Sequence, residues 1–160
     1  MQDYLIELNH LGLTARIKRL NDSLNYNIKR LYISQNLDIE PSWHLVLLIL
    51  RKNQQLSLSD LSKRLQISQP AITKLVKKMS AKGYVQLSPS TKDTRVKHIH
   101  LTKKSMDTFP KWERVWSVGE QVIGEMLEGN EVFIDALTDF ESEQQQLPFL
   151  ERTKRLLKEK

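Results

Sequence analysis

The sequence predicts a mainly α-helical protein that contains one small β-hairpin. Gly and Pro, which interrupt helices, are rare, with five of each in 160 residues. Long segments place apolar residues three and four positions apart, which is typical of helices that pack one face on a core. One stretch, residues 84–101, instead holds two strand-like runs around a turn-rich segment. A chain of this length can bury the core of one domain, with or without a long appendage.

The N-terminal part predicts one long helix from Tyr4 to about Asn36, disturbed near Gly12. Its apolar residues form one continuous stripe: Leu13, Ile17, Leu20, Leu24, Ile28 and Leu31. Pro41 is a typical helix-start residue, so a second, buried helix is expected from Ser42 to about Asn53, followed by a short extended link at 54–56.

Two short helices joined by a tight turn are predicted at 58–65 and 68–82. Ser68 is placed as the N-cap of the second helix, where its hydroxyl can accept a backbone N–H. Pro70 falls in the first turn, where its missing N–H costs little. The core-facing residues of this helix have the i, i+3, i+4, i+7 spacing: Ile72, Leu75, Val76 and Met79. Gly83 follows where a left-handed residue commonly ends a helix.

A β-hairpin is predicted next, with strands at 84–87 and 96–101 and a basic, turn-rich tip at 88–93. A third long helix is expected over 102–128, bent by its interior Pro110. Two further amphipathic helices follow, and the first of them places four apolar residues on one face: Phe133, Ile134, Leu137 and Phe140.

This order of elements is that of a winged helix-turn-helix, a mostly α fold with a two-stranded β-wing. We expect residues 37–101 to form the DNA-binding domain and residues 1–36 and 102–160 to form long N- and C-terminal dimerisation helices. The apolar stripes on 4–35 and 130–159 exceed what one small domain needs to bury. The working unit is therefore expected to be a homodimer.

The positive charge is concentrated in the middle of the chain. Residues 55–104 carry eleven basic and two acidic residues, whereas residues 105–160 carry seven basic and twelve acidic ones. A basic segment of this kind is typical of a surface that binds a polyanion, although an unevenly charged solvated surface is the alternative.

Several classes of protein are excluded or disfavoured by composition. The chain has no cysteine, which excludes disulfides, thiolate nucleophiles and cysteine-ligated metals. Its longest apolar run, 45–50, falls far short of the roughly 20 residues of a membrane-spanning helix. The N-terminus does not resemble a signal peptide. We therefore expect a cytoplasmic protein with no membrane partner.

The exposed face of the helix at 68–82 is the predicted surface for double-stranded DNA, because such a face suits insertion into the major groove. Its lysines can neutralise phosphates, while Gln69 and Thr73 are short enough to reach base edges. Ser68 and the free N–H groups of the first turn can hold a phosphate. The expected contacts on this helix are Ser68, Gln69, Pro70, Thr73, Lys74, Lys77 and Lys78. An ordinary solvated helix face is the alternative.

The hairpin tip adds a second predicted contact. A guanidinium at this position can enter the minor groove, so Arg95 is an expected DNA-binding residue. Asp93 can hold Arg95 in an extended pose through a bidentate pair. The alternative is an unremarkable turn aspartate beside an unrelated arginine.

These residues resemble the MarR-type winged-helix transcription regulators. The resemblance is carried by five segments: 58–65, 67–79, 82–85, 93–97 and 99–102. It implies a homodimer that binds a pseudo-palindromic operator. It also implies that Asp93 and Arg95 correspond to the family's wing pair, and that the residues given above for the helix at 68–82 correspond to its recognition-helix contacts.

The resemblance further implies a possible small-molecule effector, because MarR-type proteins generally bind effectors between the dimerisation helices and the DNA-binding domain. Arg16, Trp43 and His44 are the residues expected near such a cleft.

No catalytic residue, cofactor or metal site is predicted. The sequence contains no Gly-rich phosphate loop, nucleophile elbow or His–carboxylate metal motif. His98 and His100 share a face of one strand but have no third ligand at a useful spacing. The alternative to a DNA-binding regulator is a winged-helix protein-interaction module without specific DNA binding.

Overall fold

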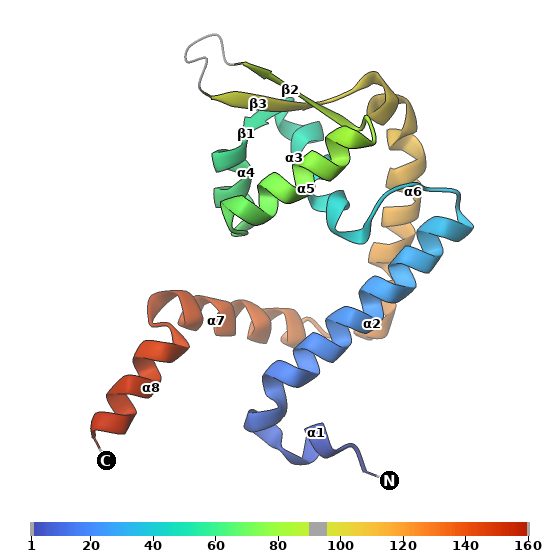
Figure 1. Cartoon of the computed structure of the whole chain (residues 1–160). Helices are drawn as coiled ribbons and strands as arrows, with labels where there is room; N and C mark the ends of the chain where they lie inside the picture. The colour runs from blue at the N-terminus through green and yellow to red at the C-terminus, as the bar shows by residue number, and fades with distance from the viewer. Residues whose placement is uncertain (1, 90–95, 160) are drawn as a thin grey trace. The chain divides into compact units, whose positions relative to one another are not determined.

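The computed structural model of the chain describes residues 2–89 and 96–159 and is predominantly helical with a small antiparallel sheet, as predicted (Figure 1). The helices are α1 (Tyr4–Glu7), η1 (Asn9–Gly12), α2 (Leu13–Ser34), η2 (Pro41–Trp43), α3 (His44–Asn53), α4 (Leu58–Leu65), α5 (Gln69–Ala81), α6 (Lys103–Met126), α7 (Val132–Gln146) and α8 (Phe149–Lys158). The strands are β1 (Gln55–Ser57), β2 (Val85–Pro89) and β3 (Lys97–Leu101). The chain divides into two compact units, Met1–Trp112 and Glu113–Lys160.

The helix expected from Tyr4 to about Asn36 is interrupted near Gly12, as predicted, and the interruption divides it into α1, η1 and α2. Asn9 adopts a positive φ of 48°, which ends α1 and starts the 3-10 helix η1. Gly12 then packs closely on α1: a Cβ atom at this position would lie 2.2 Å from the carbonyl oxygen of Leu5. The glycine therefore permits the sharp fold that brings the end of η1 against α1.

The core of the first unit lies between α2, α3, α4, α5, the sheet and the start of α6. It is built from buried side chains, among them Tyr32, Trp43, Val46, Leu47, Leu50, Leu61, Ile72, Val76, Met79, Ile99, Phe109 and Trp112. Tyr84 joins the two sides of this core, because its ring lies edge-on to Trp43 at 5.9 Å and to Trp112 at 5.4 Å between centroids.

The sheet has three strands in the order β1-β3-β2, all antiparallel (Figure 1). The β2–β3 wing was predicted, but residues 54–56 were expected to form only an extended link. Gln54 ends α3 with a positive φ of 61°, and the chain then runs beside β3 with Leu56 opposite Ile99. Burial of Leu56, which is 8% exposed, gives this short strand its place in the sheet.

α4 begins with a reciprocal cap. The Ser57 hydroxyl accepts a hydrogen bond from the backbone N–H of Asp60 at 3.1 Å, and the Asp60 carboxylate accepts one from the backbone N–H of Ser57 at 3.2 Å. The hydrogen bonds from Ser57 hold the pKa of the Asp60 carboxyl below its usual value. Gln66, in the left-handed conformation with φ 52°, ends α4 and turns the chain toward α5.

The turn at 82–84 ties the end of α5 to the start of α6. Thr102, Lys104 and Ser105 donate side-chain hydrogen bonds to its three consecutive carbonyl oxygens, at 2.7 Å from Thr102 and 2.8 Å from Lys104. The Lys104 ammonium also lies 4.1 Å from the centre of the Tyr84 ring. The first turn of α6 thus fixes the point at which α5 ends.

The second unit holds the rest of α6 together with α7 and α8. Gly129, with φ 67°, ends the preceding turn, and the Asn130 side chain accepts a hydrogen bond from the backbone N–H of Val132, the first residue of α7, at 3.0 Å. Large apolar side chains of this unit are exposed, among them Val122, Ile123, Met126, Val132, Phe133, Ile134, Leu137, Phe140, Phe149, Leu150, Leu156 and Leu157. In the described part of the chain, no helix combines the length and apolar character that a membrane crossing requires.

Candidate nucleic-acid interface

α5 presents an exposed polar face opposite its buried one. Ile72, Val76 and Met79 are buried against the core. The structure brings all seven residues expected from the sequence onto the exposed side of this helix or its N-terminus: Ser68, Gln69, Pro70, Thr73, Lys74, Lys77 and Lys78. Leu75, expected in the core stripe, is only half-buried. This amphipathic arrangement leaves a continuous surface free for a partner.

A shallow depression lies on this face and is lined by Gln69, Pro70, Thr73, Lys74 and Lys77. Thr73 is held within it, because its hydroxyl donates a hydrogen bond to the carbonyl oxygen of Gln69 at 2.8 Å. Within residues 2–89 and 96–159, neither Lys74 nor Lys77 forms an ion pair. Their ammonium groups are therefore available to an anionic partner.

Ser68 occupies the N-cap position of α5 but makes no side-chain capping hydrogen bond there. The expected cap is therefore wrong in its bonding, although it is right in its position. The backbone carbonyl of Ser68 accepts the first helical hydrogen bond, from the N–H of Ile72 at 3.0 Å. The exposed Ser68 hydroxyl remains beside the positive end of the helix dipole, where it can contact a phosphate.

The wing carries the other predicted contacts. β2 and β3 pair from Val85 opposite Leu101 to Pro89 opposite Lys97. Asp93 and Arg95 lie outside the described residues, so their contact with DNA stays a prediction.

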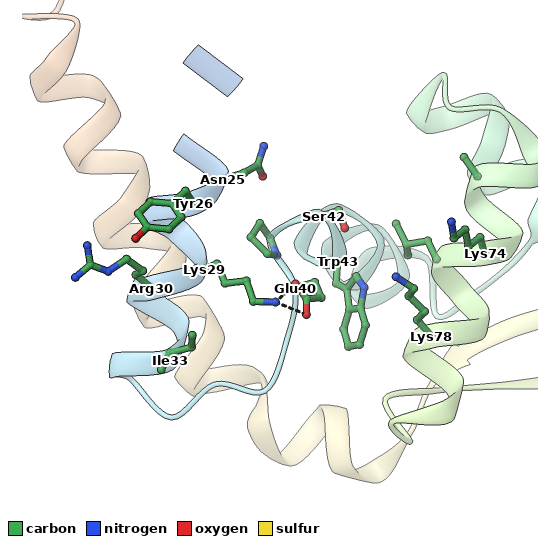
Figure 2. A pocket seen from close by; sticks show the side chains of 13 residues that line it. Asn25, Tyr26, Lys29, Arg30, Ile33, Glu40, Ser42, Trp43, Lys74 and Lys78 are labelled. Carbon is green, nitrogen blue, oxygen red and sulfur yellow. Dashed lines mark hydrogen bonds and ion pairs between the residues drawn. The ribbon is translucent and has the colours of Figure 1, made fainter. Parts of the chain in front are cut away.

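A second hollow lies between α2, η2 and α5 (Figure 2). It is an open groove of about 980 Å³ lined by Asn25, Tyr26, Lys29, Arg30, Ile33, Glu40, Pro41, Ser42, Trp43, Ala71, Lys74, Leu75 and Lys78. Lys29 donates to both carboxylate oxygens of Glu40 at 2.7 and 2.6 Å, as the dashed lines in Figure 2 mark. The groove is therefore lined by basic side chains from α2 and α5 together with aromatic and aliphatic side chains.

Only one of the three residues expected near an effector cleft lines this groove. Trp43 contributes to its wall, although the indole is only 2% exposed. Arg16 lies further toward the N-terminus of α2, and His44 begins α3 with its Nδ1 atom 2.7 Å from the carbonyl oxygen of Pro41. Neither Arg16 nor His44 is among the lining residues.

The α2 residues of the groove were missed by sequence reasoning. Two pairs at i, i+4 spacing, Asn25 with Lys29 and Tyr26 with Arg30, could have predicted that these residues share one helix face. Nothing in the sequence placed that face opposite α5.

The histidines of the wing do not form a metal site with other described residues. Ile99 between them is buried, and both His98 and His100 are partly exposed on the other face of β3, as expected. In the ranges 2–89 and 96–159, no group of three or more His, Asp and Glu side chains is arranged to hold a metal ion.

Known proteins share sequence similarity with this chain. A sequence model of the MarR family matches residues 37–96. The HTH-type transcriptional repressor IacR of Pseudomonas putida is 30% identical over 99 residues, which span 62% of this chain and 58% of that repressor.

Solved structures share the fold. The S. aureus MepR–DNA complex is similar with a TM-score of 0.72 and 20% identity over 82% of this chain and 96% of that one. Mutant MarR C80S from E. coli complexed with operator DNA has a TM-score of 0.65 and 22% identity over 89% of this chain and 98% of that one. The winged-helix region of this chain, residues 37–96, therefore matches the MarR family, and the chain spans 58% of the length of the repressor relative.

Proposed function

We propose that this protein is a sequence-specific DNA-binding transcription regulator that acts as a homodimer on a pseudo-palindromic operator. The observation that carries the proposal is the exposed face of α5, where polar and cationic side chains gather at the N-terminal half of an otherwise well-packed helix. A helix end of this kind fits the major groove, where base pairs are distinguishable by their hydrogen-bonding edges.

The chemistry of this face divides into two roles. Lys74, Lys77 and Lys78 supply the positive charge that replaces counterions on the phosphate backbone. Gln69, at the first turn, carries an amide that can pair with the N6 and N7 atoms of adenine. The proteins of similar fold crystallised with DNA, and the repressor relative, support double-stranded DNA as the partner of this face.

The homodimer is part of the proposal. We assign residues 37–101 to DNA binding and residues 1–36 and 102–160 to dimerisation. The exposed apolar side chains of α7 and α8 support this assignment, because a patch of that extent on a monomer is typical of a protein interface. A two-fold dimer presents two recognition helices, which suits half-sites about 34–36 Å apart on one side of the duplex.

We also propose that the groove between α2 and α5 receives a small-molecule effector. Lys74 lines both this groove and the depression on the DNA-binding face, so an anionic ligand in the groove competes with phosphate for the same side chain. Linkage then requires that DNA and ligand alter each other's affinity by the same factor. A ligand detected by thermal shift that leaves DNA affinity unchanged contradicts this part of the proposal.

Selection from a random duplex library tests the function directly. The full chain is incubated with the library at physiological salt, and bound sequences are amplified and compared. We expect enrichment of a two-fold symmetric site that binds at least a thousandfold more tightly than random duplex. Weak binding to all duplexes alike favours the alternative, a winged helix that binds a protein partner. As a regulator of this kind the chain acts by binding, without catalysis, and in the cytoplasm.

A further inference from the structure

The hydroxyl of Thr73 forms a hydrogen bond within α5. It donates its single hydrogen to the Gln69 carbonyl oxygen at 2.8 Å, the oxygen of the residue four positions earlier. Thr73 is exposed, so its side chain can contact a partner through its methyl group and through the acceptor lone pairs of the hydroxyl. Thr73 therefore has no hydroxyl hydrogen left for a base.

Pro70 extends the apolar character of this point. It lies three residues before Thr73, on the same side of the helix, and both residues line the depression on α5. The proline ring has no N–H to donate and presents only methylene groups. Gln69, Lys74 and Lys77 complete the lining of the depression. Pro70 and Thr73 thus form an apolar spot with a polar and basic rim.

The major groove of DNA offers one apolar group that such a spot can recognise, the 5-methyl group of thymine. We propose that Thr73 and Pro70 form a pocket that reads a thymine methyl in each half-site. This rests on the proposed function, since it requires α5 to enter the major groove. The lysine rim suits the flanking phosphates, which hold the helix at the depth where the methyl contact forms.

Uracil substitution tests the proposal, because deoxyuridine lacks only the 5-methyl group and pairs as thymine does. In the duplex selected by the full chain, each thymine is replaced in turn by deoxyuridine, symmetrically in both half-sites. We expect one position per half-site at which the wild-type dissociation constant rises about fourfold for each lost contact, the equivalent of about 0.8 kcal/mol for one buried methyl or methylene group.

Two substitutions of Thr73 separate the methyl from the hydroxyl. Thr73→Ser removes the methyl and keeps the hydroxyl, so it is expected to bind the thymine duplex more weakly than wild type does. Its further loss on the uracil duplex is expected to be smaller than that of wild type, because only the Pro70 contact remains. Thr73→Val keeps a methyl and removes the hydroxyl, so it is expected to retain the sensitivity to uracil. Thr108→Ser is the matched control, because Thr108 also donates to a carbonyl four residues earlier, at 2.7 Å, but lies on α6.

The outcomes are distinct. A uracil effect that persists unchanged in Thr73→Ser overturns the methyl pocket, as does a Thr73→Val protein that loses uracil sensitivity along with Thr73→Ser. A wild-type protein that binds a selected site but tolerates uracil everywhere overturns it too. If the wild-type protein enriches no site from the random duplex library, the proposed function itself is refuted.

Discussion

Lys77 is an exposed side chain for which we propose a contact with the DNA backbone. It lies on the open face of α5 without an ion pair among the described residues, so binding DNA breaks no ion pair within residues 2–89 and 96–159. We expect Lys77→Ala to weaken binding to every duplex similarly and to reduce the slope of log K against log salt by about one unit. Fluorescence anisotropy titrations at several salt concentrations measure this. Lys111→Ala, on exposed α6, is the control, and an equal effect of both variants contradicts the assignment.

Gln69 is expected to behave in the opposite way. Its amide lies at the first turn of α5, where base edges are within reach. Replacement by Ala is expected to cost about 1–3 kcal/mol on the selected site and to relax its sequence preference, with the salt slope little changed. The measurement is a titration on the selected duplex and on single-base variants of it. A uniform loss on all duplexes would instead assign Gln69 to the phosphates.

At the scale of elements, the reciprocal cap of α4 gives the fold a defined response to acid. The folded-state pKa of Asp60 is lowered, so its contribution to stability is present above its unfolded value near 3.8 and disappears as the pH falls through the lower folded value. Asp60→Asn is expected to lower the free energy of unfolding at neutral pH by about 1 kcal/mol or less, because Asp60 is exposed.

Urea denaturation of both proteins from pH 7 to pH 2.5 checks the cap. The difference between wild type and Asp60→Asn is expected to shrink steadily below pH 4. A difference that stays constant over this range would mean that the carboxylate charge contributes nothing to the cap.

The 82–84 turn is a second element whose hydrogen bonds contribute to the stability of the fold. Ser105 is fully buried and donates its hydroxyl hydrogen to the Tyr84 carbonyl oxygen, which also accepts the backbone N–H of Thr102 at 3.2 Å. Since that oxygen keeps a partner, Ser105→Ala is expected to cost only about 1 kcal/mol of stability, measured by urea denaturation. Ser34→Ala is the control, because Ser34 makes a similar bond to a carbonyl, at 2.8 Å, on an exposed surface. An equal cost for both serines contradicts a special role for the buried bond.

The elements that sequence reasoning identified best are those whose local signals agree with their tertiary role. In α5 the apolar spacing, Pro70 in the first turn and Gly83 after the end all favour the same helix, and the structure has it. The segment before α2 was expected to be helical with a disturbance near Gly12, but the break at Asn9 and the fold over Gly12 were not specified by the sequence. β1 was missed because its three residues acquire strand geometry only by pairing with β3.

At the scale of the molecule, the candidate site has two parts. The exposed face of α5 belongs to a single helix, whereas the groove is lined by residues from several elements. The face of α5 was readable because every residue on it comes from one helix. The groove of Figure 2 was not, because α2, η2 and α5, which are separate in the sequence, together line it. Periodicity identifies which face of a helix is exposed but not which other helix that face meets.

The proposed assembly of two chains concerns the whole molecule, and α7 offers the sharpest test of it. Phe140 is 53% exposed and lies on the apolar face of that helix with Leu137 and Phe133. If this face is buried between two copies, Phe140→Asp places a charge in an apolar interface and shifts the protein to monomer, because an unpaired buried carboxylate is strongly unfavourable. Since the residue is exposed within one chain, the helical circular dichroism signal is expected to stay unchanged.

Sedimentation equilibrium of Phe140→Asp, beside Glu141→Gln as a neighbouring surface control, measures the change. The monomeric variant is expected to bind the selected two-fold site no more tightly than a duplex holding one half-site, because it loses the effective concentration that joins the second recognition helix to the first. A variant that remains dimeric and keeps its preference for the two-fold site would remove α7 from the interface, and the dimer contacts would then have to lie elsewhere in the chain.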